Sequence, residues 1–575
     1  MQLQTTDAQR LLVRGYGPLL VLVVGFGLIA VTAPTVDQQL AGEEQPRAGG
    51  DDGPSASGAP EGPAGATADD ADDADEGAGL TVDSEADDAA EEQAQDTGAP
   101  TTGQQDEGGT TQDETTQATV DGCADRELQV PGDPYSPPCV AFEGDNPGAT
   151  TRGVTADEIV ISARVVDEPG FQEQLADIAG ADIADTPEDV MRTAEGLMDY
   201  FNERFEFYGR EMVPAFYEGQ GSSTEELLGG GHEEARADAI TAAQEIEAFA
   251  ELNAGTEPFA AALADEQVVN IGAPFLSREW FTQRRPYSWS LATDCSIVAE
   301  SIASWAIERI SAQTTAEYAR DDFQGEPRRI GLIAPENPFY QECVDAGMAI
   351  FEAEAPEEVN IVANLSYALD LSTLSNQAAN LIARLQNEGV TTILCSCDPV
   401  MPVFLTARAT EQDYWPEWNI SGVGFTDQDL VGQLFDQQQW ARAYGISYVG
   451  ETLPQQASLG YHAYRQVRDD EPAFVVDVVY YQLYMLAIGI QMAGPDLTPG
   501  TFEQGMFDYP GGSGPAGTWG FGPENYTPTE DFREVYWDPD KTSPFNNERG
   551  AYVDPNPGQR YRMGDIPPGP PNVPW

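Results

Sequence analysis

Polar side chains stand directly after several apolar runs of the sequence, at positions where a strand would end and a loop begin. They carry carboxylate, amide, hydroxyl and phenol groups, which can bind a small polar molecule through hydrogen bonds. In open parallel sheets, the strand ends and the following helix N-termini converge on such a ligand. The candidate binding residues are Glu168, Asn253, Thr256, Ser277, Tyr340, Asp398 and Asp427.

Thr256 and Tyr340 are the leading candidates. Thr256 precedes Glu257 and Pro258, so its hydroxyl is predicted to cap a helix while facing the ligand. An ordinary helix cap is the alternative for Thr256. The ring of Tyr340 would form a wall of the site, unless it packs in the core or at a hinge.

Two acids give the site its charge. Asp398 could hold an ammonium group, although an Asp directly before Pro399 is also typical of a turn. Asp427 allows the same two interpretations. The aromatic stretch 414–418 could shape an apolar pocket or pack between a helix and a strand.

Motifs of common enzyme classes are missing from the sequence. It holds no G-x-S-x-G, no H-E-x-x-H, no phosphate-binding loop and no dinucleotide fingerprint. The two histidines, His232 and His462, are expected to be structural or exposed. We therefore predict a binding protein without catalytic residues, metal or cofactor, and keep a paired-carboxylate hydrolase as the enzymatic alternative.

Strands and helices that could position these residues alternate from about residue 153 onward. Strands are predicted at 158–163, 212–217, 329–334 and 390–395, and helices follow residues 186 and 374. This alternation implies right-handed crossovers and parallel sheets covered on both faces. The repetition is too long for one ordinary sheet, so the fold class is predicted to be α/β.

The N-terminal 120 residues are predicted to lie outside this fold. Residues 17–33 form an uncharged apolar run behind Arg10 and Arg14, which places the remainder of the chain outside the membrane. We expect residues 1–38 to be a signal anchor, with a cleaved signal peptide as the alternative. Residues 39–120 are acidic and nearly free of large apolar side chains, which predicts a disordered, extended spacer.

A second long apolar run, residues 474–493, could be mistaken for another membrane span. Asp477, Gln482 and Gln491 would make a lipid-facing helix costly, so a buried core helix is predicted. Farther on, residues 517–521 and 534–537 are expected to form a terminal hairpin, and the last residues to be loosely structured.

Six cysteines follow the predicted membrane segment, and disulfides are the default outside the cell. Cys123 and Cys139 bracket a short Pro-rich stretch and are the easiest pair to join. The sequence leaves the pairing of the other four open, and metal binding is the rival interpretation. Those four are Cys295, Cys343, Cys395 and Cys397.

The order of these elements resembles the leucine/isoleucine/valine-binding branch of the type I periplasmic-binding proteins, over residues 153 to about 540. Residues 153–159 (Gly-Val-Thr-Ala-Asp-Glu-Ile) look like that branch's mature start, and residues 328–340 look like the first strand and turn of its second lobe. Residues 390–399, residues 498–503 and the closing hairpin come in the expected order.

The resemblance implies two Rossmann-like lobes with parallel sheets, joined by a hinge of about three crossovers, with a ligand between them. Lobe one would take residues 153–292 and 448–510, and lobe two residues 293–447 and 511–545. Residues 121–152 would be a Cys-bounded lead-in and residues 546–575 a Pro-rich tail. The family's amino-acid binders usually offer adjacent hydroxyl residues near position 255, where this sequence keeps only Thr256.

We therefore expect an extracytoplasmic solute-binding protein for an ABC importer, anchored to the membrane by its N-terminal segment or secreted if that segment is cleaved. Its ligand would be a small polar or amphipathic molecule, amino-acid-like or amide-like. The alternative is a ligand-sensing or adhesion module of the same fold at the cell surface. No nucleic-acid partner is expected, because the formal net charge of -71 would repel a phosphate backbone.

The acidity also makes a prediction about salt. Only about 23 of the 98 acidic residues fall between 39 and 121, so the folded part is itself strongly acidic. If the chain is adapted to high salt, its melting temperature should rise when the NaCl concentration is raised from about 0.1 M to about 1 M. The Debye length falls from about 10 Å to about 3 Å over this range, which screens the repulsion between the acids. If calorimetry shows the same melting temperature at both salt concentrations, salt adaptation is contradicted, and the acids form an ordinary solvated surface.

Overall fold

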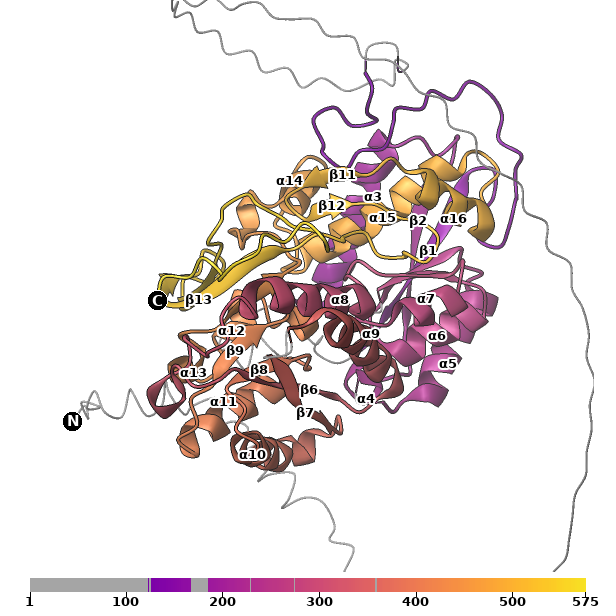
Figure 1. Cartoon of the computed structure of the whole chain (residues 1–575). Coiled ribbons are helices and arrows are strands. Elements are labelled where there is room, and N and C mark those ends of the chain that lie inside the picture. Colours follow the sequence, from indigo (N-terminus) through magenta and orange to yellow (C-terminus); the bar gives the residue numbers. More distant parts are fainter. Residues whose placement is uncertain (1–122, 124–125, 167–184, 228, 273–274, 357–358) are drawn as a thin grey trace, which may run out of the picture. The chain divides into compact units, whose positions relative to one another are not determined.

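The computed structural model describes residues 123, 126–166, 185–227, 229–272, 275–356 and 359–575. The membrane segment expected at 1–38, the spacer expected at 39–120 and the candidate residue Glu168 lie outside the described residues. Within the described part, the chain forms two parallel-sheet bodies with helices packed against them (Figure 1). The predicted α/β class with two lobes is confirmed.

The first sheet has five parallel strands in the order β2-β1-β3-β4-β5. Its strands are β1 (Glu158–Val165), β2 (Glu211–Glu218), β3 (Ala250–Ala254), β4 (Val269–Gly272) and β5 (Ser288–Trp289). The chain order reverses between β1 and β3, and such a switch point is where open α/β sheets bind ligands.

Helices from two parts of the chain surround this sheet. They are α3 (Pro187–Arg204), α4 (Ser223–Leu227), α5 (His232–Ile240), α6 (Glu257–Asp265), α7 (Arg278–Gln283), α14 (Leu459–Arg465), α15 (Val476–Ala493) and α16 (Pro499–Asp508). The predicted start of α3 is confirmed, because Thr186 and Asp189 form a reciprocal capping box around Pro187. We call this sheet and these helices the first lobe.

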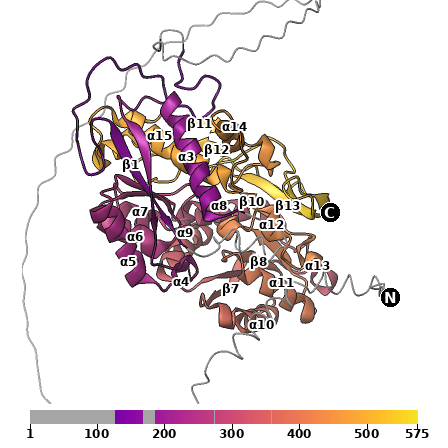
Figure 2. The ribbon, with the colours of Figure 1, turned by 180° about the vertical axis from the view of Figure 1, so that it is seen from behind.

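Helix α15 is the core helix that the polar residues in its sequence predicted. Among the described helices, it alone is long and apolar enough to cross a membrane, and 67% of it is buried inside the protein. It contacts α16 and α3, and it lies beside α3 in both views (Figures 1 and 2). Gln491 donates to the Pro138 carbonyl oxygen at 2.9 Å, so its amide is satisfied inside the protein.

The second sheet has seven strands in the order β14-β13-β10-β9-β8-β6-β7. The strands β6 (Arg329–Pro335), β7 (Asn360–Tyr367), β8 (Thr392–Cys395), β9 (Glu417–Ile420) and β10 (Tyr444–Ser447) are parallel, and β13 (Arg533–Thr542) and β14 (Arg549–Val553) extend them in antiparallel fashion. Helices α8 (Cys295–Trp305), α9 (Pro338–Glu354), α10 (Leu371–Asn387), α11 (Met401–Glu411), α12 (Asp429–Gly432) and α13 (Gln437–Trp440) complete the second lobe.

The predicted terminal hairpin between 517–521 and 534–537 is wrong. Instead, β12 (Gly517–Trp519) pairs with β11 (Gly512–Gly514), while β13 pairs with β10 and β14. The reason is that the two aromatic side chains belong to different cores. Trp519 is buried in the first lobe, and Trp537 is buried in the second against Tyr552.

The C-terminal segment is packed rather than loose. Strand β14 lies within the range 546–575 that the sequence suggested as a tail, and it adds an edge to the second sheet. Beyond it, Ile566 is buried and the ring of Trp575 meets that of Tyr536 edge-on at 5.3 Å between centroids. These apolar residues cover the second lobe, which stabilises the end of the chain.

The lead-in segment is part of the first lobe's core. The disulfide Cys123–Cys139 closes it, and Tyr135 between them is fully buried. The ring of Tyr135 lies 4.6 Å from that of Trp519, and its hydroxyl donates to the Gly517 carbonyl oxygen at 2.9 Å. The chain therefore enters the fold by inserting one tyrosine under the β11–β12 hairpin.

Replacing this tyrosine should loosen the first lobe. We expect Tyr135→Ala to lower the free energy of unfolding by about 3–5 kcal/mol, because a large buried ring and its hydrogen bond are lost. Denaturant unfolding measures the change. Tyr461→Ala is the control, since the Tyr461 hydroxyl bonds an exposed Glu471, and it should cost less than about 1 kcal/mol. Equal effects of the two variants would show that the lead-in is not a core element.

Candidate functional site

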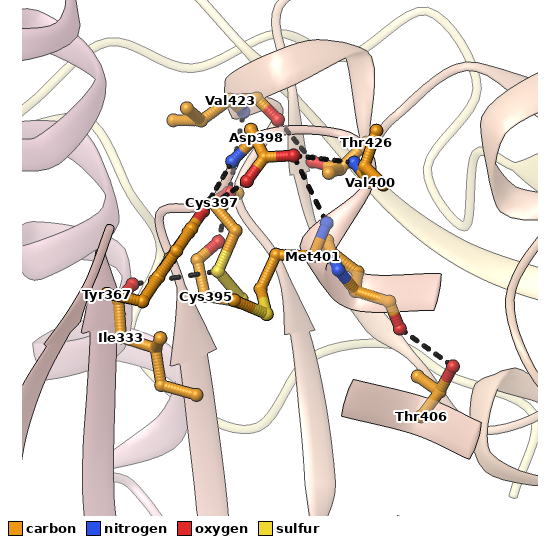
Figure 3. Close-up of a disulfide and its surroundings, with 12 residues drawn as sticks. Ile333, Tyr367, Cys395, Cys397, Asp398, Val400, Met401, Thr406, Val423 and Thr426 are labelled. Carbon is orange, nitrogen blue, oxygen red and sulfur yellow. Dashed lines mark hydrogen bonds between the residues drawn. A yellow bond between two sulfur atoms is a disulfide. The ribbon is translucent and has the colours of Figure 1, made fainter. Parts of the chain in front are cut away.

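Asp398 and Tyr367 meet at the carboxyl end of the second sheet. Strand β7 ends at Tyr367, whose hydroxyl donates to Asp398 Oδ2 and accepts from the Asp398 N–H at 3.0 Å (Figure 3). Asp398 Oδ1 accepts from the N–H groups of Val400 and Met401 at 2.8 and 3.1 Å. Asp398 is thus a turn residue, and its carboxylate also bonds the Tyr367 hydroxyl at the strand ends.

Burial governs the protonation of this group. Desolvation raises the pKa of Asp398, although the Tyr367 hydroxyl and the two N–H groups oppose it. Desolvation, and then the charge of Asp398, also raise the pKa of Tyr340 and of Tyr367. Tyr340, half-buried in the first turn of α9 with its ring beside that of Phe339, therefore belongs to the same electrostatic group. A carboxyl and two neutral phenols offer hydrogen bonds to a polar solute.

A disulfide across one residue fixes the loop that carries Asp398. Cys395 ends β8 and is joined to the fully buried Cys397 (Figure 3). The loop after β9 packs closely on it, because a Cβ at Gly424 would stand 2.7 Å from the Cys397 carbonyl oxygen. Gly424 also has a φ of +60°, so glycine suits this position on two grounds.

The remaining cysteines are paired as well. Cys123 is joined to Cys139, as the sequence suggested, and Cys295 at the start of α8 is joined to Cys343 on α9. The prediction of disulfides is confirmed. Among the described residues, no group of three or more His, Cys, Asp or Glu side chains could hold a metal ion.

Asp427 is a buried acid near the point where the chain leaves the second sheet. Its Oδ2 accepts from the Ser447 hydroxyl at 2.7 Å, and Ser447 is the last residue of β10. Its Oδ1 is buried without a hydrogen-bond partner among the described residues. Desolvation raises the pKa of Asp427, while Ser447 and the positive charge of Arg533 lower it. An unsatisfied buried carboxylate oxygen is costly, so this atom keeps an unused acceptor.

In the first lobe, Thr256 bonds an acid instead of capping its helix. Thr256 stands before α6 as predicted, but its side chain makes no capping bond. Its hydroxyl donates to Glu226, a residue of α4 that is 2% exposed. Asn253 at the end of β3 is exposed and has a φ of +56°, a left-handed conformation that Asn tolerates.

Arg164 gathers acids at the carboxyl end of β1. Its guanidinium donates to both carboxylate oxygens of Glu226 at 2.8 and 2.9 Å, and to Asp238 Oδ2 at 3.1 Å. The guanidinium carbon lies 3.8 Å from the centre of the Phe259 ring, so one face of the group is covered by an aromatic ring. Desolvation lowers the pKa of Arg164, and the two carboxylates more than offset it, so the net direction is upward.

Glu251 lies in the middle of β3, next to this cluster. It is fully buried, bonded to the Ser162 hydroxyl, and accepts from the Arg164 N–H at 2.6 Å. Burial raises the pKa of Glu251 to about 8, against the lowering effects of Ser162 and Arg164. This shift predicts that Glu251 carries a proton at neutral pH inside the first lobe.

Loops that follow strands of one sheet contact loops and helices of the other. Ser277, which caps α7 after β4, donates to Glu342 of α9 at 2.5 Å. Phe275, also after β4, meets Phe425, which follows β9, with ring centroids 5.2 Å apart. The carboxyl ends of the two sheets therefore lie on facing sides of the lobes.

The structure divides the predicted site residues into groups. Asp398 bonds Tyr367, and its charge raises the pKa of Tyr340. Thr256 belongs to the Arg164 cluster, and Ser277 makes a contact between the lobes. Arg164 and Glu226, which the sequence analysis missed, form a buried ion pair in the first lobe. Arg164 could have been found by extending the predicted strand 158–163 by one residue, whereas the position of Glu226 depends on tertiary packing.

A hollow of about 450 Å³ lies elsewhere, at the amino ends of the second sheet's strands. Arg329 at the start of β6, Asn360 at the start of β7 and Thr391 before β8 are among the residues that line it. Asp398 and Tyr367 stand at the opposite, carboxyl ends of these strands. The hollow is therefore separate from the candidate site.

No protein-family model matches the sequence, and no curated protein matches it either. Solved structures similar to this chain include a solute-binding protein of an ABC transporter from R. palustris in complex with 4-hydroxybenzoate (11% identity, 69% of this chain and 97% of that chain, TM-score 0.48). Another is the branched-chain amino acid transporter substrate-binding protein LivJ from Streptococcus pneumoniae in complex with isoleucine (14%, 69% and 100%, 0.45). A third is a leucine-, isoleucine-, valine-, threonine- and alanine-binding protein from Brucella ovis (12%, 72% and 98%, 0.48).

The raised pKa of Glu251 predicts a pH dependence of stability. Because the folded protein holds this proton up to about pH 8 and the unfolded chain releases it near 4.5, the stability that it contributes falls as pH rises between these values. One such proton gives a slope of roughly 1.4 kcal/mol per pH unit. Glu251→Gln should remove this slope from the unfolding free energy and keep both hydrogen bonds.

Glu218→Gln on β2 is the matched control, since Glu218 is exposed and water surrounds its carboxylate in both states. We expect its pH profile to follow that of the wild-type chain. A Glu251→Gln profile that also follows the wild type would mean that Glu251 is ionised inside the sheet.

Proposed function

We propose that this chain is an extracytoplasmic solute-binding protein of the type I periplasmic-binding family, which holds a small polar or amphipathic solute between its lobes for an ABC importer. The observation that supports it is the placing of polar groups at the carboxyl ends of both parallel sheets. These ends lie on facing sides of the lobes, as the contacts Ser277–Glu342 and Phe275–Phe425 indicate. Ligands of open α/β sheets bind at such ends.

The chemistry of the two lobes favours a solute with groups of both polarities. Asp398 and Asp427 in the second lobe are carboxyl groups whose pKa is raised by burial, and a donor such as an ammonium or amide N–H would satisfy them. Arg164 and Thr256 in the first lobe present donors to a carboxylate. An amino-acid-like or amide-like solute has this arrangement of groups.

Location and delivery are the remaining parts of the proposal. The apolar run at 17–33 would anchor the chain to the membrane, and the acidic spacer would hold the lobes away from its surface. The two disulfides within the second lobe agree with an oxidising compartment. The partner of the loaded protein would be the permease of an ABC importer.

Screening for a solute tests the proposal. The full chain is heated with amino acids, short amides, urea and aromatic acids, because a compound that binds only the folded state raises the melting temperature. Small-angle scattering then shows whether the chain contracts on binding, as a solute carrier should. Binding without contraction would favour a sensing or adhesion module, and a screen without any hit would contradict solute capture.

Substitution of the acids locates the site. For a hit that carries a donor group, we expect Asp398→Asn to weaken binding by about tenfold to a hundredfold in calorimetric titration, because hydrogen bonds to charged groups contribute about 1.5–3 kcal/mol. Glu354→Gln, at the exposed end of α9, is the control and should leave the affinity unchanged. Unchanged affinity in Asp398→Asn would place the solute elsewhere.

A further inference from the structure

We infer that the Glu226 carboxylate is a displaceable internal ligand of the first lobe, and that the solute carries a carboxylate which takes its place. This inference rests on the proposed function and deepens it by naming the chemical group. The receiving groups are Arg164 and Thr256, and the occupant comes from the connection between β2 and α5.

The contacts of Glu226 are those by which proteins recognise a free carboxylate. Two nitrogens of the Arg164 guanidinium face its two oxygens at 2.8 and 2.9 Å, which is the bidentate arrangement. The Thr256 hydroxyl adds a third donor to Oε2. Together these donors give both carboxylate oxygens at least one hydrogen bond.

The receiving groups belong to the rigid part of the lobe. Arg164 stands one residue before the end of β1, at the sheet's switch point, and Phe259 of α6 covers its guanidinium. Thr256 stands directly before α6, and its hydroxyl makes no capping bond, so Glu226 is the acceptor that a solute carboxylate would replace. A carboxylate that replaced Glu226 would therefore find its donors already oriented, which reduces the cost of binding.

The occupant belongs to a short element that can move without disturbing the sheet. Helix α4 has five residues, and it lies between Gly221 and Gly229. Gly229 and Gly231 have φ of +85° and +64°, values that few other residues tolerate. Leu227 at the end of α4 is a large apolar residue left 37% exposed, so little apolar packing holds this end of the helix.

Charge balance explains why an occupant is needed when no solute is bound. Without Glu226, the buried guanidinium would keep Asp238 as its acid partner, and the Thr256 hydroxyl would lose its acceptor. Unpaired buried donors are costly, so the chain supplies its own carboxylate. A solute carboxylate restores the same bonds. The free energy of the exchange then depends on how well water solvates the displaced Glu226 carboxylate.

The first experiment uses small acids as probes of the full chain. Glu226→Ala leaves a space of carboxylate size in front of Arg164 and Thr256. At constant ionic strength, formate, acetate and propionate should raise its melting temperature in a saturable way by several degrees, while acetamide and chloride should not. Adding Thr256→Val to this variant should weaken acetate binding by about tenfold, because one donor is lost.

Glu257→Ala is the matched control for the first experiment. Glu257 also meets an arginine, Arg284, at 3.7 Å, and an N–H donor, the Trp280 indole, at 2.8 Å. Its side chain is 22% exposed, so water fills the space that the substitution leaves, and acetate should have no effect. Absence of any carboxylate effect in Glu226→Ala would overturn the inference. If Glu226→Ala fails to fold, the second experiment decides alone.

The second experiment asks whether Glu226 leaves its place in the wild-type chain. Backbone hydrogen exchange is followed at Glu226 and Gly230, whose N–H groups bond to Ser222 and Glu225 carbonyl oxygens at 2.9 Å. Molar acetate should speed exchange of both compared with equal chloride, because the displaced side chain releases α4. Equal protection in acetate and chloride would show that Glu226 is a fixed structural partner and would overturn the inference.

Neither experiment depends on knowing the solute or on contraction of the lobes. If the solute screen fails while both acetate experiments succeed, the first lobe has a carboxylate site and solute capture by two lobes is contradicted. If the screen succeeds with solutes that lack a carboxylate and the acetate experiments fail, solute capture stands and the internal ligand is rejected.

Discussion

Arg164 and Arg328 each bring a guanidinium into the interior of a lobe, where an unpaired charge would be too costly to tolerate. Each is therefore bound by a buried acid, Glu226 in the first lobe and Glu417 in the second. The two pairs lie in different sheets, one at the amino ends of the strands and the other at a carboxyl end. The Arg328 pair is at the amino ends, where it ties β6 to β9, and the Arg164 pair is at the carboxyl end of β1. The need to pair buried charge thus shapes both the scaffold and the site.

Composition makes this use of arginine significant. The chain has 98 acidic and 27 basic residues, and Lys541 is its only lysine. With acids in such excess, carboxylates can stay on the surface, and the scarce cations are available to neutralise those that are buried. Arginine suits this role because its planar fork binds both oxygens of a carboxylate, whereas an ammonium acts as a point charge. Arg309, which binds both oxygens of the buried Glu534, follows the same rule.

Regular elements could be predicted from the sequence because their signals are local. The capping residues before α3, the apolar stripe of α10 and the strand at β6 depend on neighbours within a few residues. The terminal hairpin could not be predicted in this way, because pairing of β12 and β13 was decided by the cores that Trp519 and Trp537 enter. Similarly, Tyr135 stands in a Pro-rich segment without periodicity, and only the fold reveals it as a core residue.

The positions of the candidate residues could be predicted for the same reason. Position after a strand is a local signal, and it selected Thr256, Asp398 and Asp427. The partners of these residues are distant in sequence, since Thr256 bonds Glu226 and Asp398 bonds Tyr367. Position therefore indicates which residues stand at the strand ends, but the partner decides what each can still bind. A hydroxyl already bonded to a carboxylate is available only by exchange, whereas Asp427 Oδ1, buried without a partner among the described residues, can accept a donor directly. Under the proposed function, the first lobe would therefore bind a solute by exchange and the second by addition.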